Sequence, residues 1–219
     1  MKKILSTTAI AGSLCLLGTS AFAQTKAFEG PHLGLFGSFA GAEVDGSGST
    51  GSSKTGNGTA GKVTPLGGID LGYGFAAGKD FVFGLGLSYI PMKAEIGEGK
   101  VDSTASISGE LKDHYTVYLQ PTFIINKDAA AYIKAGYNHA DLKVSNATGV
   151  SNDLEGWMGA IGLKVMLTPN AFMAVEASYS DYDSVKGTRT TTAGTASTTT
   201  TVTGDPKVAQ GSVILGFKF

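Results

Sequence analysis

The chain is poor in cysteine, in proline and in net charge. Its 219 residues include one cysteine and six prolines, and 17 Lys and Arg stand against 18 Asp and Glu. A single cysteine, Cys15, excludes a disulfide framework and a cysteine metal site. The balanced charge leaves no basic surface for nucleic acid, so nucleic acid is not an expected partner. Three scattered histidines make a poor metal site, and we expect neither a metal nor a cofactor.

The chain also lacks a long hydrophobic run after residue 23, which excludes a transmembrane helix there. Its amino terminus has a different pattern. Lys2 and Lys3 precede a mostly apolar stretch, 4–17, and Ala21-Phe22-Ala23 before Gln24 matches the small-x-small site that signal peptidase cleaves. We predict a cleaved secretory signal peptide over 1–23, which takes Cys15 with it, and one mature domain over 24–219.

What the chain does have is glycine, 32 residues of it, and apolar residues that alternate with small or polar ones. This period of two predicts eight strands. They lie near residues 31–42, 63–75, 81–93, 114–125, 131–140, 156–167, 171–180 and 207–219. Tight turns are expected at 76–80, 126–130 and 168–170, and long connections near 43–62, 94–113, 141–155 and 181–206. An even number of strands with short turns at one end and long loops at the other is typical of an outer-membrane barrel.

The two faces of these strands differ in a way that favours the membrane. One face is apolar and carries no charge, whereas the other is mostly Gly, Ser and other small or polar residues. A soluble sandwich or a lipocalin-like barrel would need Lys and Glu on its outer surface. We therefore expect an all-β fold, an eight-stranded antiparallel transmembrane β-barrel whose apolar face contacts lipid.

Aromatic residues mark the two expected water boundaries on the apolar face. The loop side carries Phe39, Tyr89, Tyr115, Tyr137, Trp157 and Tyr179, and the turn side carries Tyr73, Phe75, Phe81, Phe83, Phe123, Phe217 and Phe219. With a rise of about 3.3 Å per residue and a tilt of about 40°, the strands between the two sets span roughly 20 to 25 Å. Two such aromatic girdles are expected of a lipid-facing barrel.

The closing segment Gly211-Ser212-Val213-Ile214-Leu215-Gly216-Phe217-Lys218-Phe219, with the signal peptide and the eight alternating strands, resembles the small outer-membrane β-barrel family of OmpX-, OmpA-barrel- and opacity-type surface proteins. The resemblance implies the outer membrane of a Gram-negative bacterium. It also implies an assembly signal at Phe217 and Phe219. The partners it implies are outer-membrane lipid and lipopolysaccharide, with periplasmic chaperones and the barrel-assembly machinery during biogenesis. It supplies no catalytic residues, and the surface ligand is unknown.

Four charged residues are expected to point into the barrel: Asp70, Lys134, Lys164 and Glu176. They lie at similar depth, so Glu176 is expected to reach Lys164 and also Lys134. Buried charges must neutralise one another. Either they plug an interior only wide enough for side chains, or they line a narrow ion-gated passage.

Three functions follow from these patterns. The first is a non-enzymatic surface barrel that acts through its loops in adhesion or envelope integrity, and the alternative is a small passive channel. The third is an outer-rim hydrolase, because two Asp-His pairs, Asp113 with His114 and Asp141 with His139, lie near the loop ends of strands, where Asp181 and Asp183 could complete a cluster. The first long connection is rich in Gly and Ser from Asp45 to Gly61 and is predicted to be flexible there. The Thr-rich stretch 188–203 is either a hairpin above the membrane or a hydrated tract.

Overall fold

The computed structural model describes residues 25–50, 53–102, 105–144, 153–193 and 196–219. The predicted signal peptide lies outside these residues. Within them, no helix has the length and hydrophobicity to cross a membrane. A three-residue 3-10 helix, η1 (Thr25–Ala27), precedes the first strand.

Ten antiparallel strands make up the rest of the described fold. Their bounds are β1 Gly30–Thr50, β2 Ser53–Ala76, β3 Phe81–Ile90, β4 Ala94–Asp102, β5 Ala105–Ile124, β6 Ala129–Val144, β7 Asp153–Met166, β8 Ala171–Tyr182, β9 Val185–Ala193 and β10 Ala196–Lys218.

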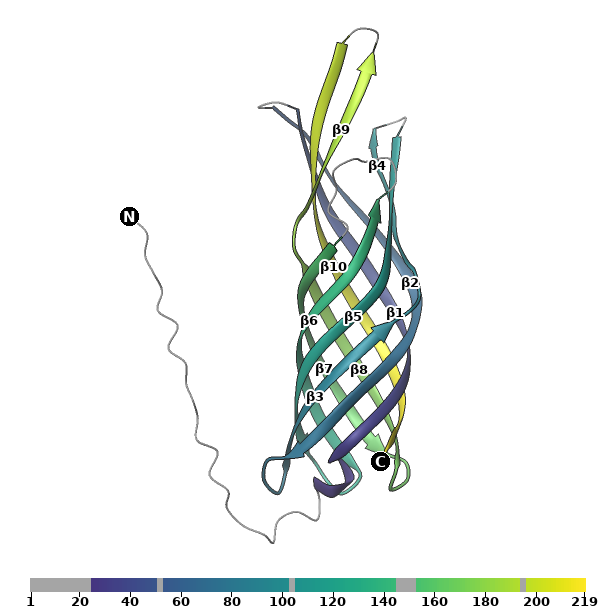
Figure 1. Cartoon of the computed structure of the whole chain (residues 1–219), viewed down its shortest axis with the longest axis vertical. Coiled ribbons are helices and arrows are strands. Elements are labelled where there is room, and N and C mark those ends of the chain that lie inside the picture. The colour runs from purple at the N-terminus through teal and green to yellow at the C-terminus, as the bar shows by residue number, and fades with distance from the viewer. Residues whose placement is uncertain (1–24, 51–52, 103–104, 145–152, 194–195) are drawn as a thin grey trace, which may run out of the picture.

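Eight of these strands close a ring. The order is β1-β2-β3-β5-β6-β7-β8-β10, and β10 pairs back onto β1 from Lys218 opposite His32 to Thr201 opposite Ser49. Figure 1 shows the resulting barrel of tilted strands, with the tight turns and the carboxy terminus at one end. The predicted eight-stranded antiparallel barrel is thus confirmed for the ring.

The two additional strands lie in connections that were predicted as loops. β4 pairs with β5, and β9 pairs with β10, so two hairpins extend from the end opposite the tight turns (Figure 1). We call the β4–β5 hairpin the first arm and the β9–β10 hairpin the second arm. In the second arm Ala193 lies opposite Ala196, and pairing continues to Val185 opposite Gly204. The Thr-rich stretch is therefore a hairpin, the first of its two predicted alternatives.

The first long connection also differs from the prediction of a flexible loop. β1 and β2 stay paired as far as Thr50 opposite Ser53, so segment 43–62 continues the ladder. Gly has low strand propensity, but the β1 half of this segment pairs with β2 on one side and with β10 on the other. Tertiary pairing therefore overrides local composition.

The three tight turns lie where the sequence predicts them. Ala77 N–H donates to the Phe81 carbonyl at 2.8 Å, and Leu167 N–H donates to the Ala171 carbonyl at 2.8 Å. In the middle turn, the Asn126 side-chain oxygen accepts hydrogen bonds from two backbone N–H groups, those of Asp128 and Ala129. Such side-chain acceptors are typical of Asn in turns.

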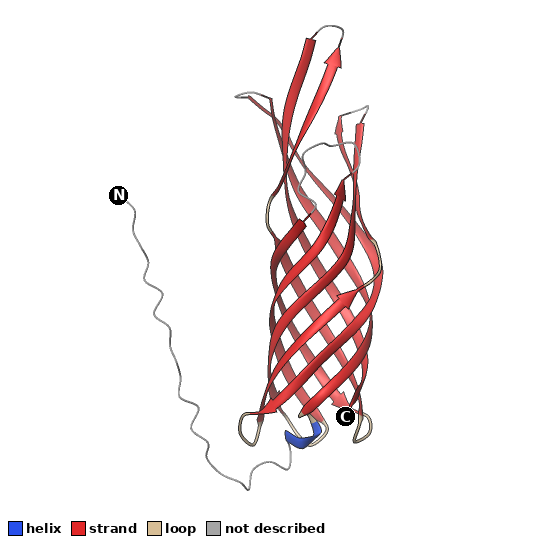
Figure 2. Ribbon diagram, in the orientation of Figure 1, coloured by secondary structure: helices blue, strands red, loops and turns tan. Residues whose placement is uncertain are grey.

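The apolar face points outward, as predicted. Leu35 is 63% exposed, Ile161 65% and Val213 49%. The alternate residues point inward, where Ser38, Asp70 and Ser212 are buried. Figure 2 shows that the strands wrap all the way round the barrel, so the exposed apolar band encircles it.

The burial of the exposed apolar band in the membrane can be tested by substitution. We expect Ile161→Arg to lower the free energy of unfolding in lipid vesicles by about 2 to 4 kcal/mol, because it places a charge near the bilayer midplane. Thr199→Arg, on an exposed part of the second arm, is the matched control and should change it by less than about 0.5 kcal/mol. Equal effects of the two substitutions would contradict a lipid-facing band.

Candidate functional site in the barrel interior

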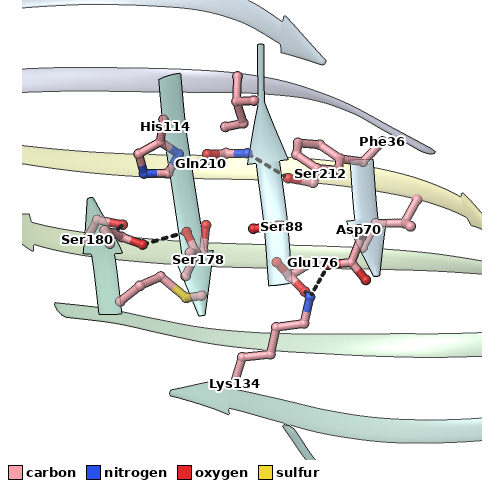
Figure 3. Close-up of a pocket in the computed structure, with 15 residues that line it drawn as sticks. Phe36, Asp70, Ser88, His114, Lys134, Glu176, Ser178, Ser180, Gln210 and Ser212 are labelled. Atoms are coloured by element: carbon pink, nitrogen blue, oxygen red, sulfur yellow. Dashed lines mark hydrogen bonds and ion pairs between the residues drawn. The ribbon is translucent and has the colours of Figure 1, made fainter. Parts of the chain in front are cut away.

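Three of the four predicted lumenal charges meet inside the barrel. Lys134 of β6 lies between Glu176 of β8 and Asp70 of β2, with its Nζ 2.8 Å from Glu176 Oε2 and 3.4 Å from Asp70 Oδ2 (Figure 3). The three side chains are at most 10% exposed. A single cation thus ties two carboxylates on opposite parts of the ring, and we call these three residues the charge triad.

Two tyrosines complete the charge triad. The Tyr118 hydroxyl lies 2.9 Å from each Asp70 carboxylate oxygen, and the Tyr132 hydroxyl donates to Glu176 Oε2 at 3.0 Å. The Tyr118 ring also lies under the Lys134 ammonium, 4.2 Å from ring centre to Nζ, a favourable cation–π contact. Both carboxylates therefore have a cation and a hydroxyl donor.

Two glycines make room for these tyrosines. Gly86 lies opposite Tyr118 on the neighbouring strand, and a Cβ there would lie 2.3 Å from the tyrosine hydroxyl. Gly162 lies between Tyr132 and Glu176 in the ladders, and a Cβ there would lie 2.2 Å from the Tyr132 ring. At these two inward glycines the space is therefore occupied by a tyrosine ring from the adjacent strand.

His32 is a further neighbour of the charge triad. Its Nε2 lies 3.6 Å from Asp70 Oδ1, and its ring packs edge-on against Phe172 with centroids 5.8 Å apart. Sequence reasoning did not select His32, Tyr118 or Tyr132. A signal was available, since Tyr118 alternates with the lipid-facing Val117 and Leu119 and so had to point inward.

Lys164 does not join the charge triad. It forms no ion pair within the described residues, and the expected pair with Glu176 is not formed. Its ammonium lies 4.5 Å from the centre of the Phe172 ring and 5.9 Å from that of Tyr132. The reason is the register of β7 and β8. Glu176 lies opposite Gly162, whereas Lys164 lies opposite Ala174, two residues nearer the tight turn that joins these strands.

Apolar side chains fill the interior on both sides of the charge triad. The turn-side cluster consists of Phe28, Val82, Ile124, Ala130, Tyr132, Met166, Phe172, Ala174 and Ile214. The loop-side cluster consists of Ala140, Leu142, Leu154 and Tyr182, with Val44, Val185 and Val208 packed against it. Phe28 belongs to the segment before β1, so the chain ahead of the barrel helps to close the turn end.

Between the charge triad and the loop-side cluster lies a polar cavity of about 40 Å³. Hydroxyl and amide side chains surround it, including Ser88, Ser178 and Gln210 (Figure 3). His114 also lines this cavity, with its Nε2 2.9 Å from the Tyr182 hydroxyl. At about 10 to 15 Å³ per water, the cavity holds only about three waters.

Of the two predicted Asp-His pairs, Asp113 and His114 do not contact each other, whereas His139 Nε2 lies 3.9 Å from Asp141 Oδ1. Asp113 accepts a hydrogen bond from Tyr89 at 3.0 Å on the outside of the barrel, whereas His114 points inward to Tyr182. Asp113 has a φ of 48°, and the β5–β6 register shifts between Lys112 and Tyr115. This bulge places the two neighbouring side chains on opposite sides of the wall.

The six predicted loop-side girdle residues all lie on the outer wall. Phe39 is 68% exposed and Trp157 70%, and Tyr89, Tyr115, Tyr137 and Tyr179 are between 37% and 52% exposed. The rings of Tyr137 and Trp157 pack edge-on at 5.3 Å. At the other end, Phe217 and Phe219 also face outward, with ring centroids 5.4 Å apart.

Just beyond this girdle, three side chains bring possible metal ligands together. Donor atoms of His139, Asp141 and Asp153 lie within 4.8 Å of one another. The side chains of His139 and Asp141 are 23% and 48% exposed, and Glu155 lies 3.8 Å from His139 Nδ1. The group has the chemistry of a weak cation site, but exposed acidic groups often cluster at protein surfaces without an ion.

The ion pairs of the charge triad predict that the two buried lysines contribute differently to stability. We expect Lys134→Met to lower the free energy of unfolding by about 3 to 5 kcal/mol, because it leaves two buried carboxylates without their cation. Lys164→Met is the matched control and should cost about 1 kcal/mol or less, because Lys164 has no ion pair to lose within the described part of the chain. Denaturant titration in detergent or vesicles measures both, and equal losses would contradict the triad.

Solved structures similar to this chain include several small outer-membrane barrels. The outer membrane protein OprG from Pseudomonas aeruginosa is 16% identical, with a TM-score of 0.59 over 87% of this chain and 98% of that one. Ail, the attachment invasion locus protein of Yersinia pestis, is 17% identical, with a TM-score of 0.43 over 87% of this chain and 99% of that one. Neisserial surface protein A is 14% identical, with a TM-score of 0.44 over 84% and 97%.

No curated protein sequence matches the chain. The likeness to OprG is a likeness of fold, since the identity is low. The family model for the outer membrane protein beta-barrel domain, however, matches residues 9–219, nearly the whole chain. This protein therefore belongs to the outer membrane protein beta-barrel family, and it resides in the outer membrane of a Gram-negative bacterium.

Proposed function

We propose that this protein is a non-conducting, non-enzymatic surface barrel that acts through its extracellular hairpins in adhesion or envelope integrity. The observation that carries the proposal is the filling of the interior. Along the barrel axis lie the turn-side cluster, the charge triad, a cavity for about three waters and the loop-side cluster. Such a sequence of layers supports a plug rather than a passage.

The extracellular arms support a role in binding. β9 pairs with β10 along one edge and ends the strand order, so its second edge has no strand partner within the described residues. An unpaired edge of extended backbone can add a strand from another protein. The arm is rich in Thr, which favours extended structure, and its Thr190 and Thr199 hydroxyls lie 3.3 Å apart across the hairpin.

The absence of an Asp113–His114 pair supports the non-enzymatic part of the proposal. His114 points inward to the Tyr182 hydroxyl, away from Asp113 on the outside of the wall. Lipopolysaccharide remains the proposed lipid partner of the outer girdle, because Tyr and Trp rings favour the boundary between lipid and water.

Planar-bilayer recording tests the closed interior. Purified, refolded protein should give no discrete current steps, because apolar clusters lie in the interior on both sides of the charge triad. Steady steps that change on Lys134→Met would overturn the plug and favour the passive channel. Heat-modifiable migration on a gel confirms that a silent sample is folded.

Deletion of 188–203 tests the arm. We expect cells that display the shortened protein to lose at least half of the adhesion that the full-length protein confers, because the deletion removes both the free edge and its Thr-rich support. Deletion of 97–108, in the β4–β5 arm, is the matched control for the loss of a hairpin. Full adhesion after the first deletion would exclude the arm as the binding surface.

A further inference from the structure

Four side chains on the outer wall, just beyond the loop-side girdle, form a group that neither the plug nor the arms explain. The described ladder of β6 and β7 ends at Asp141 opposite Asp153, and His139 lies opposite Glu155, two residues nearer the girdle. On each strand the residue between the two members of the group is buried in the interior. Because side chains of a strand alternate between its faces, all four members share the outer face.

The charges of this group do not cancel. Asp141 and Asp153 lie directly opposite each other, where Cβ atoms are about 5 Å apart and like charges are unfavourable. Lys112 of β5 lies opposite Asp141 in the neighbouring ladder and supplies one positive charge. The two aspartates and Glu155 make three carboxylates against that one ammonium, which leaves two negative charges in excess. A divalent cation would balance them.

The histidine distinguishes this group from an ordinary cluster of exposed acidic residues. The three histidines are scattered in the sequence, but the fold places carboxylates from two strands around one of them. Donor atoms of His139, Asp141 and Asp153 lie within 4.8 Å of one another, and His139 Nε2 lies 3.9 Å from Asp141 Oδ1. Ligands about 2.0 to 2.2 Å from a zinc ion lie about 3 to 4 Å apart, so side-chain shifts of about 1 Å would bring all three donors onto one ion.

Further contacts orient the histidine ring. It stacks on Tyr115 of β5, with ring centroids 4.9 Å apart and 28° between the planes. Its Nδ1 lies 3.8 Å from Glu155 Oε1, and Glu155 in turn accepts a hydrogen bond from the Tyr137 hydroxyl at 2.7 Å. A carboxylate beside the second ring nitrogen is the usual support of a metal-binding histidine, because it fixes the tautomer and the ring orientation. Nε2 is then the nitrogen on the side of Asp141.

We propose that His139, Asp141 and Asp153 bind a divalent first-row transition metal ion, with Zn²⁺ as the expected ion. Imidazole and carboxylate groups are common zinc ligands, and three protein ligands leave a fourth position to water. Glu155 is a positioning residue, since it acts through His139. The bound ion links β6 and β7 at the last described pair of their ladder.

The single tryptophan of the chain makes the site measurable. Trp157 lies on β7 two residues from Glu155, and its ring packs against that of Tyr137. Co²⁺ accepts the same ligands as Zn²⁺, and because it is paramagnetic it quenches the fluorescence of a nearby indole. Folded mature protein without a histidine tag is titrated with Co²⁺ in detergent. We expect a saturable loss of fluorescence at one ion per chain, which an excess of Zn²⁺ reverses.

Substitutions assign the ligands. His139→Ala should abolish the saturable loss, and Glu155→Gln should weaken Co²⁺ binding about 10- to 100-fold, the usual effect of removing the support of a metal ligand. Asp113→Asn is the matched control, because Asp113 is also a rim carboxylate bonded by a girdle tyrosine, Tyr89, and should leave the affinity unchanged. Heat-modifiable migration on a gel confirms that each variant is folded. Quenching that does not saturate, or that is equal with and without His139, would overturn the proposal and leave an acidic surface that attracts cations weakly.

Discussion

The pairing of β10 with β1 is the constraint on which the rest of the structure depends. In hydrocarbon no water can satisfy a backbone N–H or C=O group, so every strand in the bilayer needs a partner on both edges. The first and last strands of the chain meet that demand for each other, from His32 opposite Lys218 to Ser49 opposite Thr201. Once the ring is closed, alternate side chains of each strand face the lipid and the barrel interior. Both the apolar band and the filled lumen are consequences of it.

A ring of eight strands leaves an interior only wide enough for side chains. The chain fills it by placing large side chains over glycines, which have no side chain of their own. Tyr118 lies over Gly86, and Tyr132 lies over Gly162. These tyrosines extend their hydroxyls to Asp70 and Glu176, whose charges would otherwise be too costly to bury. The glycine on one strand therefore makes room for the tyrosine whose hydroxyl donates a hydrogen bond to a buried carboxylate on another strand.

Much of the fold could be predicted because strand alternation is a local signal. The outward position of Ile161, the tight turn at Asn126 and the inward position of Asp70 all follow from parity and turn chemistry. The partners of the charges followed only in part, because they depend on register across strands far apart in sequence: Glu176 reaches Lys134, as expected, but not Lys164. Glu176 meets Lys134 rather than Lys164 since Gly162 lies opposite it. The ladder at 43–62 was missed for a related reason, as long-range pairing overrides a Gly- and Ser-rich composition.

β10 is a single strand of 23 residues that serves both the barrel and the second arm. Its lower part pairs with β8 and β1, and its upper part pairs with β9 and β1. A partner that pulls on the arm therefore pulls along the axis of β10 rather than peeling it sideways. The hydrogen bonds of the seam are then loaded together, in shear, and none has to fail first. The strand that closes the cylinder thus also joins the second arm directly to the wall of the barrel.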